Sequence, residues 1–325
     1  MSCPGCLEPA EGRLLGEHRD PVAGGRYRLL RCPACALVYA DPRVSPGADF
    51  YRRVHSGETR AWGEDWRHRV FFDAGLPPGR LFDVGCGDGR FLLEARARGW
   101  TVSGVDFNGD YVAAARASGL EDVELGDVFD ALARRRGCAA ITLFDALEHM
   151  SEPARLLEAL RDALSPGGHL ALAVPDAARP LLSEANRERY DFPPYHFTRW
   201  TEDSLRRALA RAGFEPVLFL HSPLHLGFFA GQLYYRALYA LFPLFKRLLT
   251  GAKKGEEGRT FSELLAKDGG RMGALADPDR RQRIVDAGYL AARVLLFPLD
   301  APLVLAFRLL APHRGRTLFA LAKKR

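Results

Sequence analysis

A glycine-rich turn near residue 85 is the first stretch whose residue types and spacing point to chemistry. The segment 83–89 reads D-x-G-x-G-x-G and lies between a short apolar run, 81–84, and a predicted helix that starts with Phe91. Glycine lets the backbone approach a ligand closely, and the first turn of a helix offers N–H groups to it. The G-x-G-x-x-G spacing of a dinucleotide site would need a glycine where Arg90 stands. The turn therefore predicts a site for a nucleotide-type cofactor, with a glycine spacing that differs from that of a dinucleotide site.

An acidic residue ends the next predicted strand. Asp106 closes the run 100–106, 17 residues after Gly89, and a carboxylate there can accept both ribose hydroxyls of an adenosine ligand. The alternative role of such an acid is to cap a helix, but Asn108 can cap the following helix instead. The sequence therefore favours ribose binding by Asp106.

A second kind of chemistry is indicated close to the N-terminus. Two C-x-x-C pairs, separated by 25 residues, supply four cysteines: Cys3, Cys6, Cys32 and Cys35. Zinc prefers four tetrahedral thiolates, and each C-x-x-C turn presents two sulfurs to one metal. The run 27–31 alternates like a strand, and 36–39 reads as its partner. We therefore expect a zinc ribbon over residues 1–45, with either a structural role or a role in substrate recognition.

Elements that can position these residues alternate regularly from residue 80 onward. The predicted strands are 81–84, 100–106, 123–128, 139–144 and 214–220. Strands that alternate with helices predict an α/β fold with a largely parallel sheet. The preceding segment, 46–79, reads as a connector helix that either packs on the main domain or covers the cofactor.

Taken together, these motifs resemble the class I S-adenosylmethionine (SAM) methyltransferases. The turn 83–89 resembles their motif I, and 144–150, F-D-A-L-E-H-M, is similar to a segment of ubiquinone-biosynthesis O-methyltransferases and sugar C-methyltransferases. The segments 164–175 and 195–214 resemble their L-x-P-G-G and H-x-F-T … A-G-F segments. Sugar C-methyltransferases of this circle also carry an N-terminal zinc module. The resemblance implies a Rossmann-like, seven-stranded methyltransferase sheet and SAM as the cofactor.

The resemblance also implies roles for individual residues. In methyltransferases an acidic residue after the third strand reaches the adenine amino group, and Asp127 fits that position with Val128 beside the ring. The residues implied to contact the cofactor are Asp83, Gly85, Cys86, Gly87, Gly89, Asp106, Phe107, Asp127, Val128, Phe144 and Asp145.

Because SAM carries an activated methyl group, the protein must hold the acceptor in line and remove its proton. His149 follows the fourth strand and, as an imidazole, can act as a base near neutral pH, and His196 lies on the segment that walls the acceptor pocket in these relatives. The ubiquinone branch has E-x-x-E-H here and is associated with a divalent metal. Asp145, Glu148 and His149 are therefore a candidate site for a metal such as magnesium. Alternatively, Glu148 and His149 cap or orient the next helix. The catalytic candidates are His149, His196 and Glu148.

A long segment, 222–314, separates the sixth predicted strand from the seventh and contains two apolar stretches, 224–249 and 289–311. A spanning helix needs about 20 largely uncharged residues, and both stretches contain arginine and proline, so spanning is not expected. Helices lying in a membrane interface fit better, and the alternative is a cap buried against the domain or a dimer partner. The polar, glycine-rich residues 251–283 read as a loop between them.

The five predicted segments are a zinc ribbon (1–45), a connector (46–79), a SAM-binding core (80–221), a helical insertion (222–314) and the last core strand (315–325).

Charge and composition narrow the function further. The chain has a net charge of +6, and residues 222–316 hold 15 Lys and Arg against 8 Asp and Glu, which suits an anionic membrane surface or nucleic acid. The first residues have neither the basic nor the apolar region of a signal peptide, so we expect a cytoplasmic protein, peripheral on the inner face of the membrane.

The favoured function is O-methylation of a small-molecule or lipid-linked acceptor, with C-methylation left open. One rival is an RNA base methyltransferase, which is disfavoured because D-A-L-E-H stands where such enzymes often have N-P-P-Y. The other is a non-catalytic SAM-fold scaffold at the membrane. A nucleic-acid partner is therefore not expected, and homo-oligomers remain open.

Overall fold

The computed structural model describes residues 2–19, 25–44, 47, 65–178, 191–231, 233–234, 237, 278–310 and 315–325. The chain forms two compact units. The first comprises Met1–Ser222 with His313–Arg325, and the second comprises Pro223–Pro312.

The first unit is built on a seven-stranded sheet with the order β10-β11-β8-β7-β4-β5-β6. Its strands are β4 (Arg80–Val84), β5 (Thr101–Asp106), β6 (Val123–Leu125), β7 (Cys138–Phe144), β8 (Leu164–Pro175), β10 (Phe214–His221) and β11 (Thr317–Lys324). Neighbouring strands from β6 to β8 are parallel, whereas β11 is antiparallel to both β8 and β10. The strand order changes direction between β4 and β7, and in open α/β sheets ligands bind at that point, beyond the carboxyl ends of the strands.

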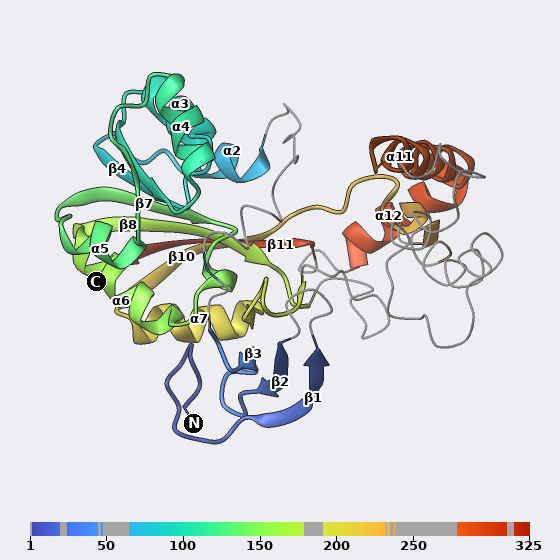
Figure 1. The fold of residues 1–325 in the computed structure, drawn as a ribbon, viewed down its shortest axis with the longest axis horizontal. Helices are drawn as coiled ribbons and strands as arrows, with labels where there is room; N and C mark the ends of the chain where they lie inside the picture. The colour runs from blue at the N-terminus through green and yellow to red at the C-terminus, as the bar shows by residue number, and fades with distance from the viewer. Residues whose placement is uncertain are drawn as a thin grey trace, which may run out of the picture. The chain divides into compact units, whose positions relative to one another are not determined.

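Helices cover both faces of this sheet (Figure 1). One face packs against α2 (Trp66–Asp73), α3 (Arg90–Ala97) and α4 (Gly109–Ala117), and the other against α5 (Val128–Ala133), α6 (Pro153–Ala163) and α7 (Glu202–Arg211). The two apolar clusters alternate along each strand, since Leu81 belongs to one and Phe82 to the other. This alternation is the period of two that a strand imposes on its side chains.

The predicted fold class is confirmed, and several boundaries differ. The third predicted strand, 123–128, ends at Leu125 because the Asp127 carboxylate accepts hydrogen bonds from the Phe129 and Asp130 N–H groups and caps α5. Within the predicted connector, 46–79, the described helix is α2, and residues 48–64 lie outside the described part of the chain.

The N-terminal module forms a four-stranded sheet with the order β1-β2-β3-β9. Its strands are β1 (Arg13–Arg19), β2 (Arg26–Arg31), β3 (Val38–Asp41) and β9 (Thr198–Arg199). The last of these, β9, comes from the segment between β8 and α7, so the module and the core share one sheet. A backbone hydrogen bond from the Ala154 N–H group to the Pro4 carbonyl adds a second attachment, at the start of α6.

A polar network lies where the chain leaves the first unit. The His221 Nδ1 atom is 2.8 Å from Asp176 Oδ2, and its Nε2 atom is 3.0 Å from Glu202 Oε2. Burial alone would lower the pKa of His221, but hydrogen bonds to Asp176 and Glu202 and their charges raise it above its ordinary value. The next residue, Ser222, accepts hydrogen bonds from the Arg316 and Thr317 N–H groups, so the chain returns to the sheet beside the point where it left.

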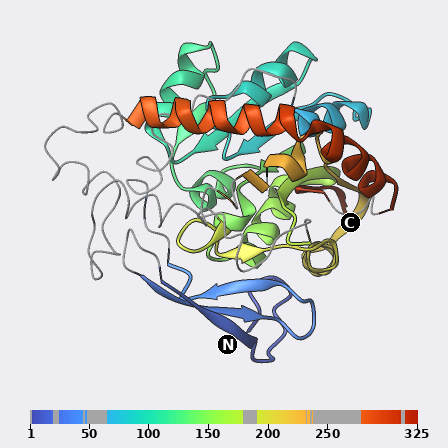
Figure 2. The ribbon, with the colours of Figure 1, turned by 90° about the vertical axis from the view of Figure 1, so that its right-hand side faces the viewer.

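The second unit contains α11 (Pro278–Leu295) and α12 (Phe297–Leu310). Figure 2 shows α11 as a straight helix, with α12 turned away from its end. The prediction of a loop over 251–283 is wrong for its last residues, because α11 begins at Pro278. The second helix, α12, continues through Pro302. Most of the first apolar stretch, 224–249, lies outside the described residues.

Candidate active site

The glycine turn between β4 and α3 is held in place by Asp106. The three glycines at 85, 87 and 89 all have positive φ, and Gly89, with φ 80°, is the N-cap of α3. A Cβ atom at Gly89 would lie 2.3 Å from Leu120, so both conformation and space require glycine there. The Asp106 carboxylate accepts hydrogen bonds from the Gly87 N–H group (2.9 Å) and the Asn108 N–H group (2.8 Å). It does not cap α4, because Asn108 does so.

The ends of β5 and β6 leave apolar side chains exposed beside the turn. Phe107, which follows β5, is 44% exposed, and Leu125, the last residue of β6, is 55% exposed. Val128 is half-buried, and Asp127 is exposed even though it caps α5. Uncovered apolar side chains next to exposed carboxylates suit the flat, amine-bearing ring of an adenosine ligand.

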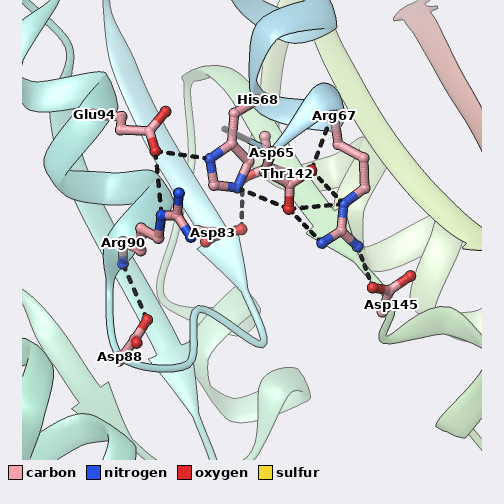
Figure 3. Close-up of polar contacts among 9 residues, drawn as sticks. All are labelled: Asp65, Arg67, His68, Asp83, Asp88, Arg90, Glu94, Thr142 and Asp145. Carbon is pink, nitrogen blue, oxygen red and sulfur yellow. Dashed lines mark hydrogen bonds and ion pairs between the residues drawn. The ribbon is translucent and has the colours of Figure 1, made fainter. Parts of the chain in front are cut away.

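The residues at the ends of β4 and β7 meet under helix α2 (Figure 3). Asp83 is buried and accepts a 2.6 Å hydrogen bond from the Thr142 hydroxyl group, which links the two strands. Arg67, in the first turn of α2, forms ion pairs with Asp65 and with Asp145, which follows β7. Asp145 has a positive φ of 51°, a conformation that aspartate tolerates better than most residues.

Arg67 lies over this strand end with its charge compensated. Its guanidinium carbon is 5.8 Å from the centre of the Phe144 ring. Burial would raise the pKa of Asp65, but the hydrogen bonds and charge of Arg67 hold it at about 2. His68 lies between Glu94 and Asp65, with its Nδ1 atom 3.1 Å from Glu94 Oε1. Helix α2 therefore fixes a cation beside Asp145, next to the glycine turn.

A buried carboxyl group and two imidazoles meet just beyond Asp145. One ligand atom from each of Glu148, His149 and His196 lies within 4.8 Å of the others, and we call these three residues the carboxyl–histidine cluster. Glu148 is 1% exposed, and neither of its carboxyl oxygens has a hydrogen-bond partner from another described residue. Burial, and then the charge of Asp145, raise the pKa of Glu148 well above its ordinary value.

Backbone and side-chain contacts orient the two imidazoles. His149 Nδ1 is 2.6 Å from the Tyr195 carbonyl oxygen, which can only accept, so Nδ1 carries the proton and the lone pair of a neutral ring is on Nε2. His196 Nδ1 lies 3.5 Å from Asp191 Oδ1, and the two rings meet edge to face with centres 4.8 Å apart.

This arrangement changes two expectations about the D-A-L-E-H segment. Asp145, which was expected to join Glu148 and His149 in a metal site, pairs with Arg67, and His196 takes its place in the group. Magnesium prefers oxygen ligands, and this cluster offers one carboxyl group with two imidazoles, so it does not fit magnesium. Nor do Glu148 and His149 cap α6, whose N-cap is Glu152 without a side-chain cap bond.

The four cysteines of the N-terminal module form a compact group. The Sγ atoms of Cys3 and Cys35 are 3.7 Å apart, as are those of Cys6 and Cys32, and all four lie within 4.8 Å of one another. Zinc–sulfur bonds of about 2.3 Å would set tetrahedral sulfurs about 3.8 Å apart. The spacing of the four sulfurs therefore fits one tetrahedral metal ion.

Comparison with known families identifies the core. The model of a family described as a methyltransferase domain matches residues 55–218, which is half of the chain. The chain belongs to this methyltransferase domain family. In this methyltransferase the seventh strand of the main sheet, β11, runs antiparallel between the fifth and sixth, β8 and β10, which is the strand order expected of a class I SAM-dependent enzyme.

Curated relatives agree with this assignment over part of their length. The chain is 38% identical over 105 residues to a ubiquinone biosynthesis O-methyltransferase of Xanthomonas campestris pv. campestris, covering 30% of this chain and 44% of that protein. A protein of the same name from Xylella fastidiosa is 37% identical over 102 residues, covering 29% and 41%. The methyltransferase thus spans less than half of the length of these relatives. A SAM-dependent methyltransferase structure from Archaeoglobus fulgidus aligns with a TM-score of 0.46 at 16% identity, covering 80% of this chain and 92% of that one.

Two groups at this site were not predicted from the sequence. Arg67 and His68 lie in the predicted connector, outside the motifs that resemble methyltransferases. The sequence signal was the D-x-R segment at 65–67, since Asp65 caps the helix and also pairs with Arg67.

Proposed function

We propose that this methyltransferase transfers the methyl group of SAM to a hydroxyl oxygen of a small or lipid-linked acceptor, and that the carboxyl–histidine cluster accepts the hydroxyl proton. The observation that carries the proposal is the buried Glu148 carboxyl group beside His149 and His196. A buried polar group without a partner costs about 1–3 kcal/mol, so its burial calls for a compensating interaction. A nearby imidazolium, formed when His149 takes a proton, supplies one.

The residues around the glycine turn fit SAM. When bound, SAM supplies an electrophilic methyl group on a sulfonium sulfur. Asp106 would accept the ribose hydroxyls, and Phe107 and Leu125 would be covered by the adenine ring, with Asp127 near its amino group. Arg67 would bind the methionine carboxylate by exchanging its ion pair with Asp145 for one with the cofactor.

The cluster can perform the proton transfer that O-methylation needs. His149 Nε2 would accept the hydroxyl proton, while the bond from Nδ1 to the Tyr195 carbonyl keeps the ring in the required tautomer. Glu148 would stabilise the resulting imidazolium, and Asp191 would orient His196 on the other side of the acceptor. The name of the curated relatives, an O-methyltransferase, supports oxygen as the methylated atom.

We also infer that Cys3, Cys6, Cys32 and Cys35 hold one zinc ion, because their sulfurs have tetrahedral spacing. In that state the metal would close a module that is too small to hold a core of its own.

The test uses purified, zinc-loaded protein with methyl-labelled SAM and a panel of acceptors that includes catechols, hydroxylated quinone precursors and lipid-linked saccharides. The His149→Asn variant is expected to lower kcat by roughly 10²- to 10⁴-fold while the Kd for SAM, measured calorimetrically, changes less than twofold. Unchanged turnover in His149→Asn would place the base elsewhere.

Metal analysis distinguishes a proton acceptor from a second metal site. If the proposal is correct, the protein contains one zinc ion per chain, and Glu148→Gln leaves that number unchanged. If the protein instead contains two metal ions per chain and Glu148→Gln loses one of them, the cluster is a metal site and the proposal of a general base is wrong.

A further inference from the structure

The charged side chains between residues 287 and 310 bond to the backbone of their own unit. Between residues 287 and 310 the chain has three charged residues, Arg293, Asp300 and Arg308. Arg293 donates a 2.9 Å hydrogen bond to the Leu226 carbonyl oxygen, and Arg308 donates through Nε to the Leu224 carbonyl oxygen at 2.7 Å. These arginines satisfy carbonyl groups at the start of the unit.

Asp300 completes this internal set. It is 2% exposed, and its two carboxylate oxygens accept hydrogen bonds from the Gly227 and Ala230 N–H groups. The carboxylate therefore satisfies N–H groups at the beginning of a helical turn, so each charge in the 287–310 segment is paired with backbone dipoles.

Many apolar side chains of the same stretch, 287–310, are exposed. Those that are at least 48% exposed are Leu290, Val294, Leu295, Phe297, Leu299, Leu303, Leu305, Leu309 and Leu310. Val304, by contrast, is buried against Leu224 and Phe228. In the stretch 287–310 the charged side chains thus bond to backbone groups while the leucines are exposed, the reverse of a helical pair that faces water.

A lipid bilayer is the environment that this arrangement suits. In hydrocarbon, unsatisfied polar groups are costly, and charged residues there pair with one another or with backbone groups. A protein partner could supply polar partners of its own, so it would not require internal pairing. No single described helix has the length and apolar character needed to cross a membrane, whereas α11 from Ala287 and α12 meet those criteria as a pair bent by 77°. The bend favours insertion into one leaflet.

The surrounding sequence adds attraction to anionic lipids. Residues 222–316 have 15 basic and 8 acidic residues, an excess of 7 positive charges. Basic residues near the surface of an anionic leaflet each add to membrane binding. We propose that the α11–α12 pair inserts its leucine face into one leaflet of an anionic bilayer and anchors the protein there. The proposal is independent of methyl transfer, because its test reads binding and depth.

The test uses the full chain and vesicles of phosphatidylglycerol and phosphatidylethanolamine, with phosphatidylcholine vesicles for comparison. The protein is expected to sediment with the anionic vesicles. The double substitution Leu299→Glu/Leu303→Glu, at two exposed positions, should lower the partition coefficient by roughly tenfold or more, since the exposed leucines supply the apolar area. A matched control is Val217→Glu, at a 57% exposed position on β10, which should bind like the wild type.

Insertion depth separates burial in the leaflet from attraction to its surface. All four tryptophans, at 62, 66, 100 and 200, lie outside the second unit, so Leu299→Trp adds a single reporter to it. Lipids brominated on their acyl chains should quench the added emission while that of the wild type changes little. Binding without quenching, equal binding by the double variant, or a dimer that fails to bind vesicles would each overturn the proposal, the last in favour of a second copy as the occupant.

Discussion

At the scale of single residues, the site includes a charged side chain from a helix that lies outside the sequence motifs of the core. Arg67 comes from the helix before the first core strand, yet it pairs with Asp145 at the end of β7. Asp106 both orients the glycine turn and would hold the ribose, so its substitution combines two effects. We therefore expect substitutions of Arg67 and of Asp106 to affect cofactor binding in different ways, and this difference can be measured.

Replacement of Arg67 by glutamine should weaken SAM binding. A charge-assisted hydrogen bond contributes about 1.5–3 kcal/mol, so the Kd is expected to rise on the order of tenfold or more by calorimetry. Arg69→Gln, an exposed change on the same helix, is the control and should leave the Kd unchanged. Equal Kd values for Arg67→Gln and wild type would remove Arg67 from the cofactor site.

The His221 network predicts a pH dependence of stability. Because the folded-state pKa of His221 is raised above its ordinary value of 6.5, its ion pairs stabilise the folded protein fully below pH 6.5. That contribution is lost as the pH rises through the higher folded pKa. Wild-type Tm should therefore fall relative to His221→Asn as pH increases from 6 to about 8, and the variant should be less stable by about 1–3 kcal/mol at pH 6. A constant Tm difference across this range would contradict the prediction.

At the scale of elements, the sequence was most informative where chemistry and local structure coincide. The glycine turn, Asp106 and the strands around them follow from period, spacing and turn residues, because a βα turn is built from contiguous residues. His149 and His196 were each identified, but their contact was not, since 46 residues separate them and a loop brings them together. The positive φ of Asp145, which turns its side chain toward Arg67, has no sequence signal of comparable strength.

Strand β9 connects the cysteine module to the carboxyl–histidine cluster. The Ala40 N–H group donates to the Phe197 carbonyl oxygen at 2.8 Å, and the Phe197 N–H group donates to the Glu148 carbonyl oxygen at 2.8 Å. Beside them, β3 pairs with β9 at Val38 and Tyr39. The module is therefore expected to hold the acceptor side of the site in place.

Removal of the metal should loosen this connection before it affects the cofactor side. In zinc-depleted protein we expect hydrogen exchange at Phe197 and β9 to accelerate at least tenfold, while protection in β4 and β5 and the Kd for SAM stay within twofold of the loaded protein. Re-addition of zinc should restore protection. Unchanged exchange at Phe197 after verified metal loss would show that β9 is held by the core alone.

At the scale of the whole molecule, the second unit is an insertion whose ends are adjacent. His221 pairs with Leu318 in the β10–β11 ladder, and the Ser222 N–H group donates to the Thr317 carbonyl oxygen at 2.8 Å. A short turn can join such antiparallel ends. The length of the insertion follows from the sequence, whereas the bonds from its charged residues to distant backbone groups are not encoded by any periodicity.

Replacement of residues 223–312 by a short glycine-containing turn should leave the first unit folded. We expect the shortened protein to bind SAM within about threefold of the full chain, because the glycine turn, Asp106 and Arg67 all lie in the first unit. Circular dichroism and calorimetry provide the measurement. Loss of folding would show that the insertion contributes to the core, and loss of SAM binding by a folded protein would assign part of the cofactor site to it.

The shared sheet has a consequence for how the protein is made. The cysteine module is synthesised before the core, so its strand β3 lacks its outer neighbour until β9 leaves the ribosome. During that interval β3 presents an open edge, which is a template for pairing with other chains. The risk of aggregation through this edge ends when β9 has been synthesised and pairs with β3. We therefore expect zinc supplied during translation to increase the soluble yield more than zinc added afterwards.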